Sequence, residues 1–189
     1  MKNISLLKTI LPIVLALVLN ACSSGARMSA MVVPITPENI ITEESKLYQS
    51  IELSEVSGGK KTNPLWTSQV GDEEFLQALL NSLKAHALIS VGEAKYRLIA
   101  KLIKIKQPLV GFDLTVKSTI QYELLEINTQ KIVYNEQVYV EYTAAFGDSL
   151  LGSKRLQLAN EGAIKDNISK FITTLISLFK SDTLVVSKK

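Results

Sequence analysis

The chain of 189 residues contains one histidine, His86, and one cysteine, Cys22. These two side-chain types most often serve as general base, nucleophile or transition-metal ligand. A Ser-His-Asp or Cys-His site would have to use His86, and no nucleophile motif lies near that residue. A zinc site needs several His or Cys ligands. We therefore expect a protein that is not an enzyme and that holds no metal and no cofactor. His86 is expected near the end of a helix, where an imidazole meets the helix dipole.

One further segment, Gly58–Thr62, contains the glycine and lysine of a phosphate-binding loop. The first glycine of such a loop would fall at Ser54, so we interpret the segment as a flexible turn. Several acidic residues lie on expected strands or next to them, where carboxylates are usually solvated and not catalytic. They are Asp113, Glu123, Glu136 and Glu141.

The position of Cys22 in the chain points to export. Lys2 and Lys8 give the chain a positive start, an apolar stretch runs from Ile10 to Leu19, and Cys22 follows closely. This is the three-part layout of a secretory signal peptide, and the apolar stretch is too short to span a bilayer as a helix. On this layout alone, Cys22 could also be a free thiol in an uncleaved anchor or beside an ordinary signal peptide.

The tetrapeptide Leu19-Asn20-Ala21-Cys22 resembles the lipobox of bacterial lipoproteins. This resemblance implies cleavage between Ala21 and Cys22, a diacylglyceryl group on the Cys22 sulfur, and acylation of the new amino terminus with a fatty acid such as palmitate. Each buried methylene of an acyl chain contributes about 0.8 kcal/mol, so two or three chains would hold the protein on a membrane.

The residue after the cysteine bears on which membrane holds the anchor. In Gram-negative lipoproteins an Asp at that position favours retention in the inner membrane, and here Ser23 occupies it. The resemblance therefore implies the periplasmic face of the outer membrane, with the outer face of the plasma membrane as the alternative.

Three segments are expected along the chain: a removed signal peptide over residues 1–21, a lipidated tether over residues 22–45, and one folded domain over residues 46–189. Pro34, Pro37 and the polar run at residues 42–45 favour the tether. Fully extended, it would reach about 70 Å. Alternatively, residues 32–35 dock on the domain as a short strand. With a single cysteine no internal disulfide can form, so burial must stabilise the domain.

The charge balance gives no support for a nucleic-acid binder of the usual basic kind. The chain has 21 Lys and Arg residues against 18 Asp and Glu residues. Residues 1–21 hold Lys2 and Lys8 and no acid, which leaves 19 basic and 18 acidic residues in the mature chain. The apparent basicity therefore comes mostly from the export signal, and we expect no nucleic acid among the partners.

Apolar periodicity predicts the order strand, helix, three strands, helix. The clearest strand covers residues 114–124, where apolar and polar residues alternate. The last helix has an apolar stripe at Ile164, Ile168, Phe171, Leu175 and Leu178. The remaining elements are expected as follows: a loosely alternating strand at 51–56, a helix capped by Asp72 and ending near His86, strands at 96–105 and 132–142, a last helix from Ser153 to Ser181-Asp182, and a short edge strand at 184–186.

Each amphipathic helix must bury its stripe, and one face of the 114–124 strand needs a cover. We therefore predict an α+β fold, a two-layer sandwich in which two helices pack on one face of a mixed four-stranded sheet. Over residues 48–180 this order resembles that of small outer-membrane lipoproteins such as the lipopolysaccharide-assembly lipoprotein family.

Three linkers are expected to emerge at one end of the molecule. If the first two strands are joined by a parallel crossover, the linkers 57–71, 107–113 and 143–153 all lie at the same edge of the sheet. They carry large apolar residues, which could form an exposed patch for a partner, with tryptophan as its anchor, or fold inward and cap the core. These residues are Leu65, Trp66, Leu109, Val110, Phe112, Phe146, Leu150 and Leu151.

Four lysines on neighbouring expected strands could bind anionic lipid headgroups, such as lipopolysaccharide phosphates, or could simply keep the sheet soluble and guard its edge. They are Lys101, Lys104, Lys106 and Lys117.

Two functions from different classes remain. The first is a lipid-anchored envelope protein that works without catalysis as a binding or assembly module for an outer-membrane or periplasmic complex. The second is a carrier or sensor of an amphiphilic ligand, lipopolysaccharide included, held between helices and sheet. The first requires an exposed apolar rim and the second an internal cavity.

Overall fold

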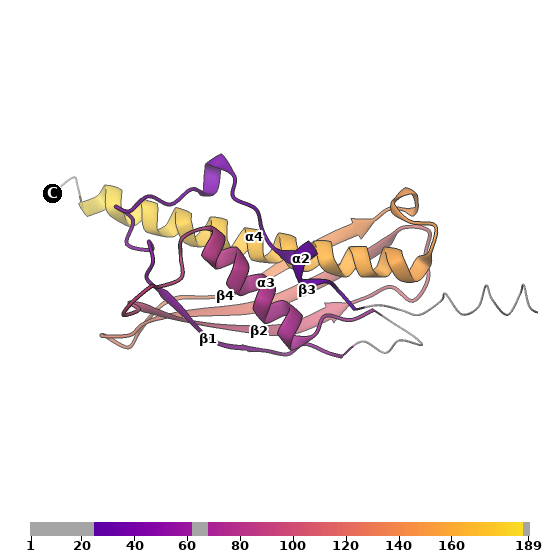
Figure 1. Cartoon of the computed structure of the whole chain (residues 1–189), viewed down its shortest axis with the longest axis horizontal. Coiled ribbons are helices and arrows are strands. Elements are labelled where there is room, and N and C mark those ends of the chain that lie inside the picture. Colours follow the sequence, from indigo (N-terminus) through magenta and orange to yellow (C-terminus); the bar gives the residue numbers. More distant parts are fainter. Residues whose placement is uncertain (1–24, 62–67, 187–189) are drawn as a thin grey trace, which may run out of the picture.

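A four-stranded sheet with the strand order β1-β2-β3-β4 forms one layer of the molecule (Figure 1). The computed structural model describes residues 25–61 and 68–186, and for residues 181–186 the backbone alone. The strands are β1 (Ile51–Ser57), β2 (Tyr96–Lys106), β3 (Leu114–Glu126) and β4 (Lys131–Ala144). β1 pairs with β2 in parallel, and the other two pairs are antiparallel, so the predicted mixed sheet is confirmed.

Strand β3 follows the alternation that its sequence predicts. Every second residue from Leu114 to Leu124 is buried, and the residues between them are only partly covered. The buried face of the sheet is therefore continuous across β3, and the opposite face meets solvent.

The loose alternation of the first two strands has a structural cause. The register shifts between Leu53 and Glu55 in β1 and between Leu102 and Lys104 in β2. Each bulge inserts a residue without a partner and reverses the alternation beyond it. Apolar patterning alone therefore describes these two strands poorly.

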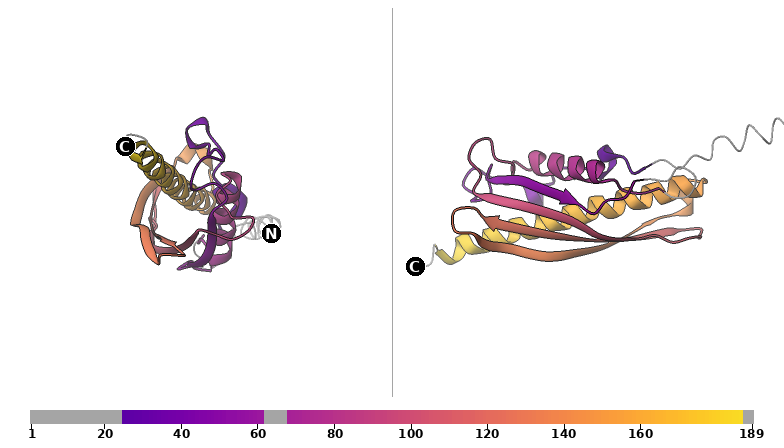
Figure 2. Two further views of the ribbon diagram at one scale, coloured as in Figure 1. Left: turned by 90° about the vertical axis from the view of Figure 1, so that its left-hand side faces the viewer. Right: turned by 90° about the horizontal axis from the view of Figure 1, so that it is seen from below.

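Two helices, α3 (Asp72–Ala85) and α4 (Gly152–Val186), cover the buried face. Figure 2 shows the sheet curling around α4, which runs along the whole length of the body. The predicted stripe of α4 is buried at Ile164, Ile168, Phe171 and Leu175, whereas its fifth residue, Leu178, is 38% exposed. At the centre, the Phe171 ring stacks on the Tyr122 ring of β3 with centroids 4.0 Å apart. The predicted two-layer α+β fold is confirmed.

The helix ends differ in detail from the expectations. Gly71 is the N-cap of α3, and Asp72 lies in the first helical turn, where its Oδ1 accepts a hydrogen bond from the Gly59 N–H at 2.6 Å. The last helix does not stop at Ser181-Asp182 but continues to Val186, so the edge strand at 184–186 does not form. Serine and aspartate inside a helix cost only a few tenths of a kcal/mol each relative to the best formers, too little to end it.

The segment from residue 25 to residue 45 is not an extended tether. It contains the helix α2 (Met28–Met31) and the 3-10 helix η1 (Pro37–Asn39), and it buries Met31 and Val33. The Val33 N–H donates to Ser82 Oγ of α3 at 2.9 Å, and residues 32–35 form no strand. The composition of this segment resembles a linker, but its few apolar side chains find room beside α3 and α4.

None of the described helices is both long enough and apolar enough to cross a membrane.

Candidate functional site

The three linkers lie at one end of the body, as the parallel crossover requires. β1 and β2 end there, β3 begins there, β4 ends there, and α4 starts there (Figure 1). The first linker leaves β1 through Gly58, whose φ of +90° favours glycine. An added Cβ at Gly58 would lie 2.1 Å from the Leu102 carbonyl oxygen, so this turn packs directly on β2.

The two linkers that the structure describes completely expose large apolar side chains. Their exposed fractions run from 44% at Phe146 to 98% at Leu109, which excludes the alternative that they cap the core. We call this set the apolar tip: Leu109, Val110, Phe112, Phe146, Leu150 and Leu151. Leu65 and Trp66 of the first linker lie outside the described residues. Large apolar side chains exposed together at one end of a molecule commonly mark a contact surface.

Contacts between the two linkers hold the apolar tip in shape. The rings of Phe112 and Phe146 meet edge to face with centroids 5.8 Å apart, and the Phe146 N–H donates to Asp113 Oδ1 at 2.8 Å. Arg155 of α4 lies beneath them and donates to the Ser149 carbonyl at 2.5 Å and to the Gly111 carbonyl at 3.4 Å. The tip is therefore preorganised by an almost fully buried arginine.

Sequence reasoning did not single out Arg155, although one signal was present. Cations are unfavourable in the first turn of a helix, where the dipole is positive. Arg155 occupies that turn and has no acidic neighbour there. A basic residue in this place suggests a tertiary role, which the carbonyl contacts of Arg155 supply.

The described chain begins beside this end of the molecule. The Gly25 carbonyl oxygen accepts a hydrogen bond from Gln157 Nε2 of α4 at 2.7 Å, and the Ala26 N–H donates to the Gln69 carbonyl at 3.0 Å. Arg27 then forms an ion pair with Glu161, whose side chain is only 4% exposed. In Figure 1 the indigo chain leads from α2 towards the end where α4 starts. The amino-terminal side of the chain therefore joins the body near the apolar tip.

The four lysines lie on β2 and β3 at different distances from the tip. Lys106 ends β2, three residues before Leu109, and pairs in register with Lys117 of β3. Lys117 Nζ donates to Glu141 Oε1 at 2.9 Å, and this hydrogen bond raises the pKa of Lys117. Among the described residues, the other three lysines form no ion pair. These are Lys101, Lys104 and Lys106.

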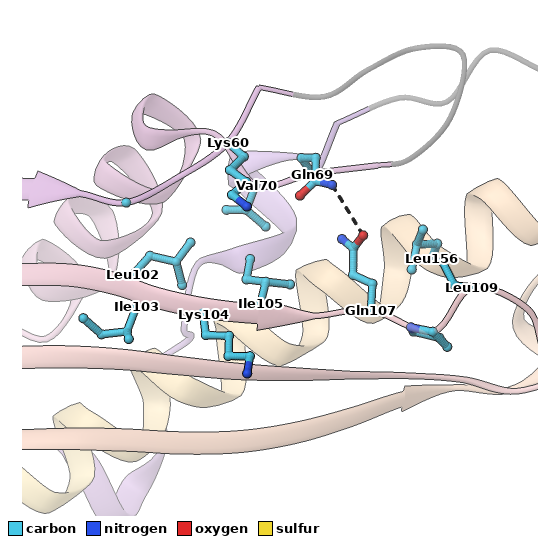
Figure 3. Close-up of a pocket in the computed structure, with 12 residues that line it drawn as sticks. Lys60, Gln69, Val70, Leu102, Ile103, Lys104, Ile105, Gln107, Leu109 and Leu156 are labelled. Atoms are coloured by element: carbon cyan, nitrogen blue, oxygen red, sulfur yellow. Dashed lines mark hydrogen bonds between the residues drawn. The ribbon is translucent and has the colours of Figure 1, made fainter.

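A cavity of about 440 Å³ opens beside the tip, between β2 and the start of α4 (Figure 3). Leu102, Ile105 and Leu156 supply much of its apolar wall, and Lys60 and Lys104 also line it. The cavity lies at the edge of the sheet, whereas the space between helices and sheet is filled by the buried core. A ligand held there would contact both alkyl groups and cations.

His86 is the C-cap residue of α3 and is buried. Its Nδ1 lies 2.7 Å from the Ser82 carbonyl oxygen, and its Nε2 has no hydrogen-bond partner among the described residues. No group of three or more His, Cys, Asp or Glu residues in the described ranges could hold a metal ion. The expected place of His86 at a helix end is confirmed.

The comparisons with known proteins rest on structure. No family model matches the chain, and no curated protein matches it in sequence. A Xanthomonas campestris protein of the DUF330 family superposes with a TM-score of 0.56 at 10% identity, covering 86% of this chain and 98% of that one. A minor lipoprotein from Acinetobacter baumannii superposes with a TM-score of 0.44 at 9% identity, covering 68% and 92%. At such identities a likeness shows the fold alone, and the conclusion is that this chain shares the α+β fold of the DUF330 protein.

Proposed function

We propose that this chain is a lipid-anchored protein of the bacterial cell envelope that works by binding and not by catalysis. Acyl chains on Cys22 hold it on the periplasmic face of the outer membrane, where it serves as a binding or assembly module for an envelope complex. One observation carries the proposal: the chain that leads from the lipobox cysteine joins the body at Gly25, at the same end as the apolar tip.

The short distance from Cys22 to the folded body supports a positioned module. Three residue steps separate Cys22 from Gly25, and from Ala26 onward the chain is fixed by the Gln69 carbonyl and by Glu161. The anchor therefore holds the body close to the bilayer with one end towards it. The sides of the body and its far end are then presented to a partner in the periplasm.

Fractionation of cells that produce the wild-type chain or the Cys22→Ala variant tests the anchor. The wild-type protein is expected to sediment with membranes and to take up labelled palmitate, and the Cys22→Ala variant is expected to take up none. A matched Ser24→Ala variant, two residues away, controls for changes near the cleavage site. No palmitate in the wild-type chain, or equal labelling of wild type and Cys22→Ala, would overturn the proposed anchor.

The binding role has its own test. Co-purification from detergent-solubilised membranes, with the anchor intact, is expected to recover one envelope protein in constant ratio. Repeating the purification with the unanchored Cys22→Ala chain should lower the yield of that protein, because the anchor raises the local concentration of the two. Recovery of the chain alone under mild detergent would contradict the assembly role and leave the anchor standing.

The cavity beside β2 favours a second candidate, a carrier or sensor of an amphiphilic ligand. Its apolar wall suits an acyl chain, and Lys60 and Lys104 suit an anionic headgroup. An apolar dye should bind there and be displaced by a long-chain fatty acid. Ile105→Glu should abolish dye binding, whereas Val91→Glu, at an exposed site far from the cavity, should leave it unchanged. Equal dye binding by both variants would remove this candidate.

A further inference from the structure

We propose that the apolar tip enters the polar surface layer of the same bilayer that holds the acyl chains of Cys22, so that the protein stands end-on on the membrane. The inference rests on the proposed lipid anchor and names the ligand of the tip, which is a phospholipid surface. It assigns the exposed loops to lipid contact instead of contact with a protein.

Chain length brings the tip and the membrane together. Gln157, which holds Gly25, lies five residues after Gly152, the first residue of α4. At about 1.5 Å per residue, Gly25 therefore lies about 8 Å behind the start of α4. Three residue steps from Gly25 to Cys22 reach at most about 11 Å. A fully extended connection thus brings Cys22 only about level with the loops that form the tip.

This short reach favours lipid over a protein partner at the tip. A single helix with its side chains is about 10–12 Å across. The connection lets Cys22 pass the start of α4 by only about 3 Å, so not even one helix fits between the tip and the membrane. The bilayer itself needs no such space. Leu109, Val110 and Leu150 are each more than three-quarters exposed. All three side chains are apolar, so a membrane surface can bury them.

The polar groups of the tip limit how deep it can go. Exposed loop backbone cannot enter the hydrocarbon core, where its N–H and C=O groups would lose their partners. The polar layer on each side of that core is about 5–8 Å thick, which suits side chains inserted from two loops. Asp113 and Asp148, the two carboxylates of these loops, each accept a backbone N–H at 2.8 Å, and the Arg155 guanidinium lies beside the loops.

Lysine positions agree with this depth. Lys106 precedes Leu109 by three residues, so it lies at the level of the lipid phosphates when the tip is inserted. Lys101 lies about 15 Å further back along β2 and stays in water. An apolar end followed by a cation is the usual arrangement of side chains that enter a lipid surface.

The test uses the acylated, mature protein in vesicles of phosphatidylethanolamine and phosphatidylglycerol. Because the Cys22 sulfur is bonded to lipid, a cysteine introduced by Leu109→Cys or Leu150→Cys is the only free thiol and can carry an environment-sensitive nitrobenzoxadiazole label. Val91→Cys is the matched control, since Val91 is 82% exposed in the linker at the opposite end of the sheet. All three sites are exposed, so labelling leaves the core intact.

The labels at residues 109 and 150 are expected to shift to shorter wavelength and to be quenched by lipids with a nitroxide in the upper acyl chain, while the label at residue 91 stays aqueous. If all three labels emit as in water and are not quenched, on protein that floats with the vesicles, the anchor stands and the inference is overturned. A shift seen only in native membranes, and not in pure lipid, would also overturn it, because a protein then covers the tip. Protein that fails to float at all would instead contradict the proposed anchor.

Lysine variants sharpen the test. Lys106→Gln should lower the equilibrium constant for membrane insertion of the residue-109 label by up to about fivefold. Added salt should lower the same constant. Lys101→Gln should leave that fraction unchanged. Equal effects of the two variants would contradict the end-on orientation.

Discussion

Arg27 and Glu161, 134 residues apart in the chain, join the amino-terminal segment to the first third of α4. The guanidinium donates to both carboxylate oxygens at 3.0 and 3.1 Å, and the Arg27 backbone N–H donates to Oε1 at 2.8 Å. Three donors on one nearly buried carboxylate fix both the position and the direction of the chain that comes from Cys22. With the proposed lipid on Cys22, this joint would set a defined distance between the body and the membrane.

Replacing Arg27 by Ala is expected to loosen this joint. Glu161 would keep one backbone donor in a buried site, so the free energy of unfolding should fall by about 1–3 kcal/mol. Urea unfolding measures the loss. Arg97→Ala is the control, because its ion pair with Glu52 at 2.6 Å is exposed on both sides and should contribute less than about 1 kcal/mol. A smaller loss for Arg27→Ala than for Arg97→Ala would contradict the role given to Arg27.

Asn167 is expected to be among the polar residues on which stability depends most. Its Nδ2 donates to the Val138 carbonyl at 2.8 Å and to Ser118 Oγ at 3.1 Å, and its Oδ1 accepts from the Tyr122 hydroxyl at 3.2 Å. Asn167→Leu would leave buried groups unsatisfied and should cost about 2–4 kcal/mol in urea unfolding. Ser177→Ala, on the exposed side of the same helix, should stay within about 0.5 kcal/mol. Similar losses of unfolding free energy for Asn167→Leu and Ser177→Ala would contradict a stabilising role for the hydrogen bonds of Asn167.

Alkaline pH should destabilise the fold through its buried tyrosines. Burial raises the pKa of Tyr122 well above its ordinary value of 10.0, and burial followed by the nearby Glu136 raises the pKa of Tyr134. Both groups hold their protons more tightly when folded, so stability is complete below pH 10 and falls as the pH rises towards the folded pKa values. Between the unfolded and folded pKa values, the folded state holds a proton that the unfolded state has lost. Each tyrosine in this condition should lower the free energy of unfolding by about 1.4 kcal/mol per pH unit.

The measurement is urea unfolding of wild type and Tyr122→Phe over a series of pH values from about 9 to about 11.5. The variant should start less stable, because Asn167 Oδ1 loses its donor, and should lose stability less steeply with pH. Parallel pH dependence in the two proteins would show that Tyr122 is not responsible.

If Cys22 carries the proposed lipid, the residue after it should decide which membrane holds the protein. Ser23→Asp is expected to move the chain from the outer to the inner membrane fraction without changing its folding, because residue 23 precedes the described body. Sucrose-gradient separation of the two membranes measures the distribution, and Ser24→Asp serves as a control for the added charge. Wild-type protein in the inner-membrane fraction would contradict the outer-membrane assignment, and an unchanged distribution for Ser23→Asp would contradict the role given to residue 23.

Short-range pattern predicted most of the fold. The period-two alternation at residues 114–124 and the stripe at Ile164, Ile168, Phe171 and Leu175 each identify a single buried face, and the structure buries both. The crossover rule placed the apolar linkers at one end. What pattern could not indicate was the pair of bulges, since each reverses the alternation on which the prediction depends.

Long-range contacts explain the remaining differences. The segment before residue 46 has the composition of a linker, yet Glu161 and Ser82 fix it to the two helices. Neither partner can be identified from local sequence. The same holds for the exposure of the tip, because the linker residues alone do not reveal whether Arg155 holds them outward or the core takes them in.

The amino-terminal peptide of the purified mature protein tests the central claim most directly. Mass spectrometry of this peptide is expected to show a chain that starts at Cys22 and carries the mass of a diacylglyceryl group with a further acyl chain on its amine. A peptide that still contains residues 1–21, or one that starts at Cys22 with an unmodified thiol, would contradict a lipid anchor and with it the placement of the apolar tip at the membrane.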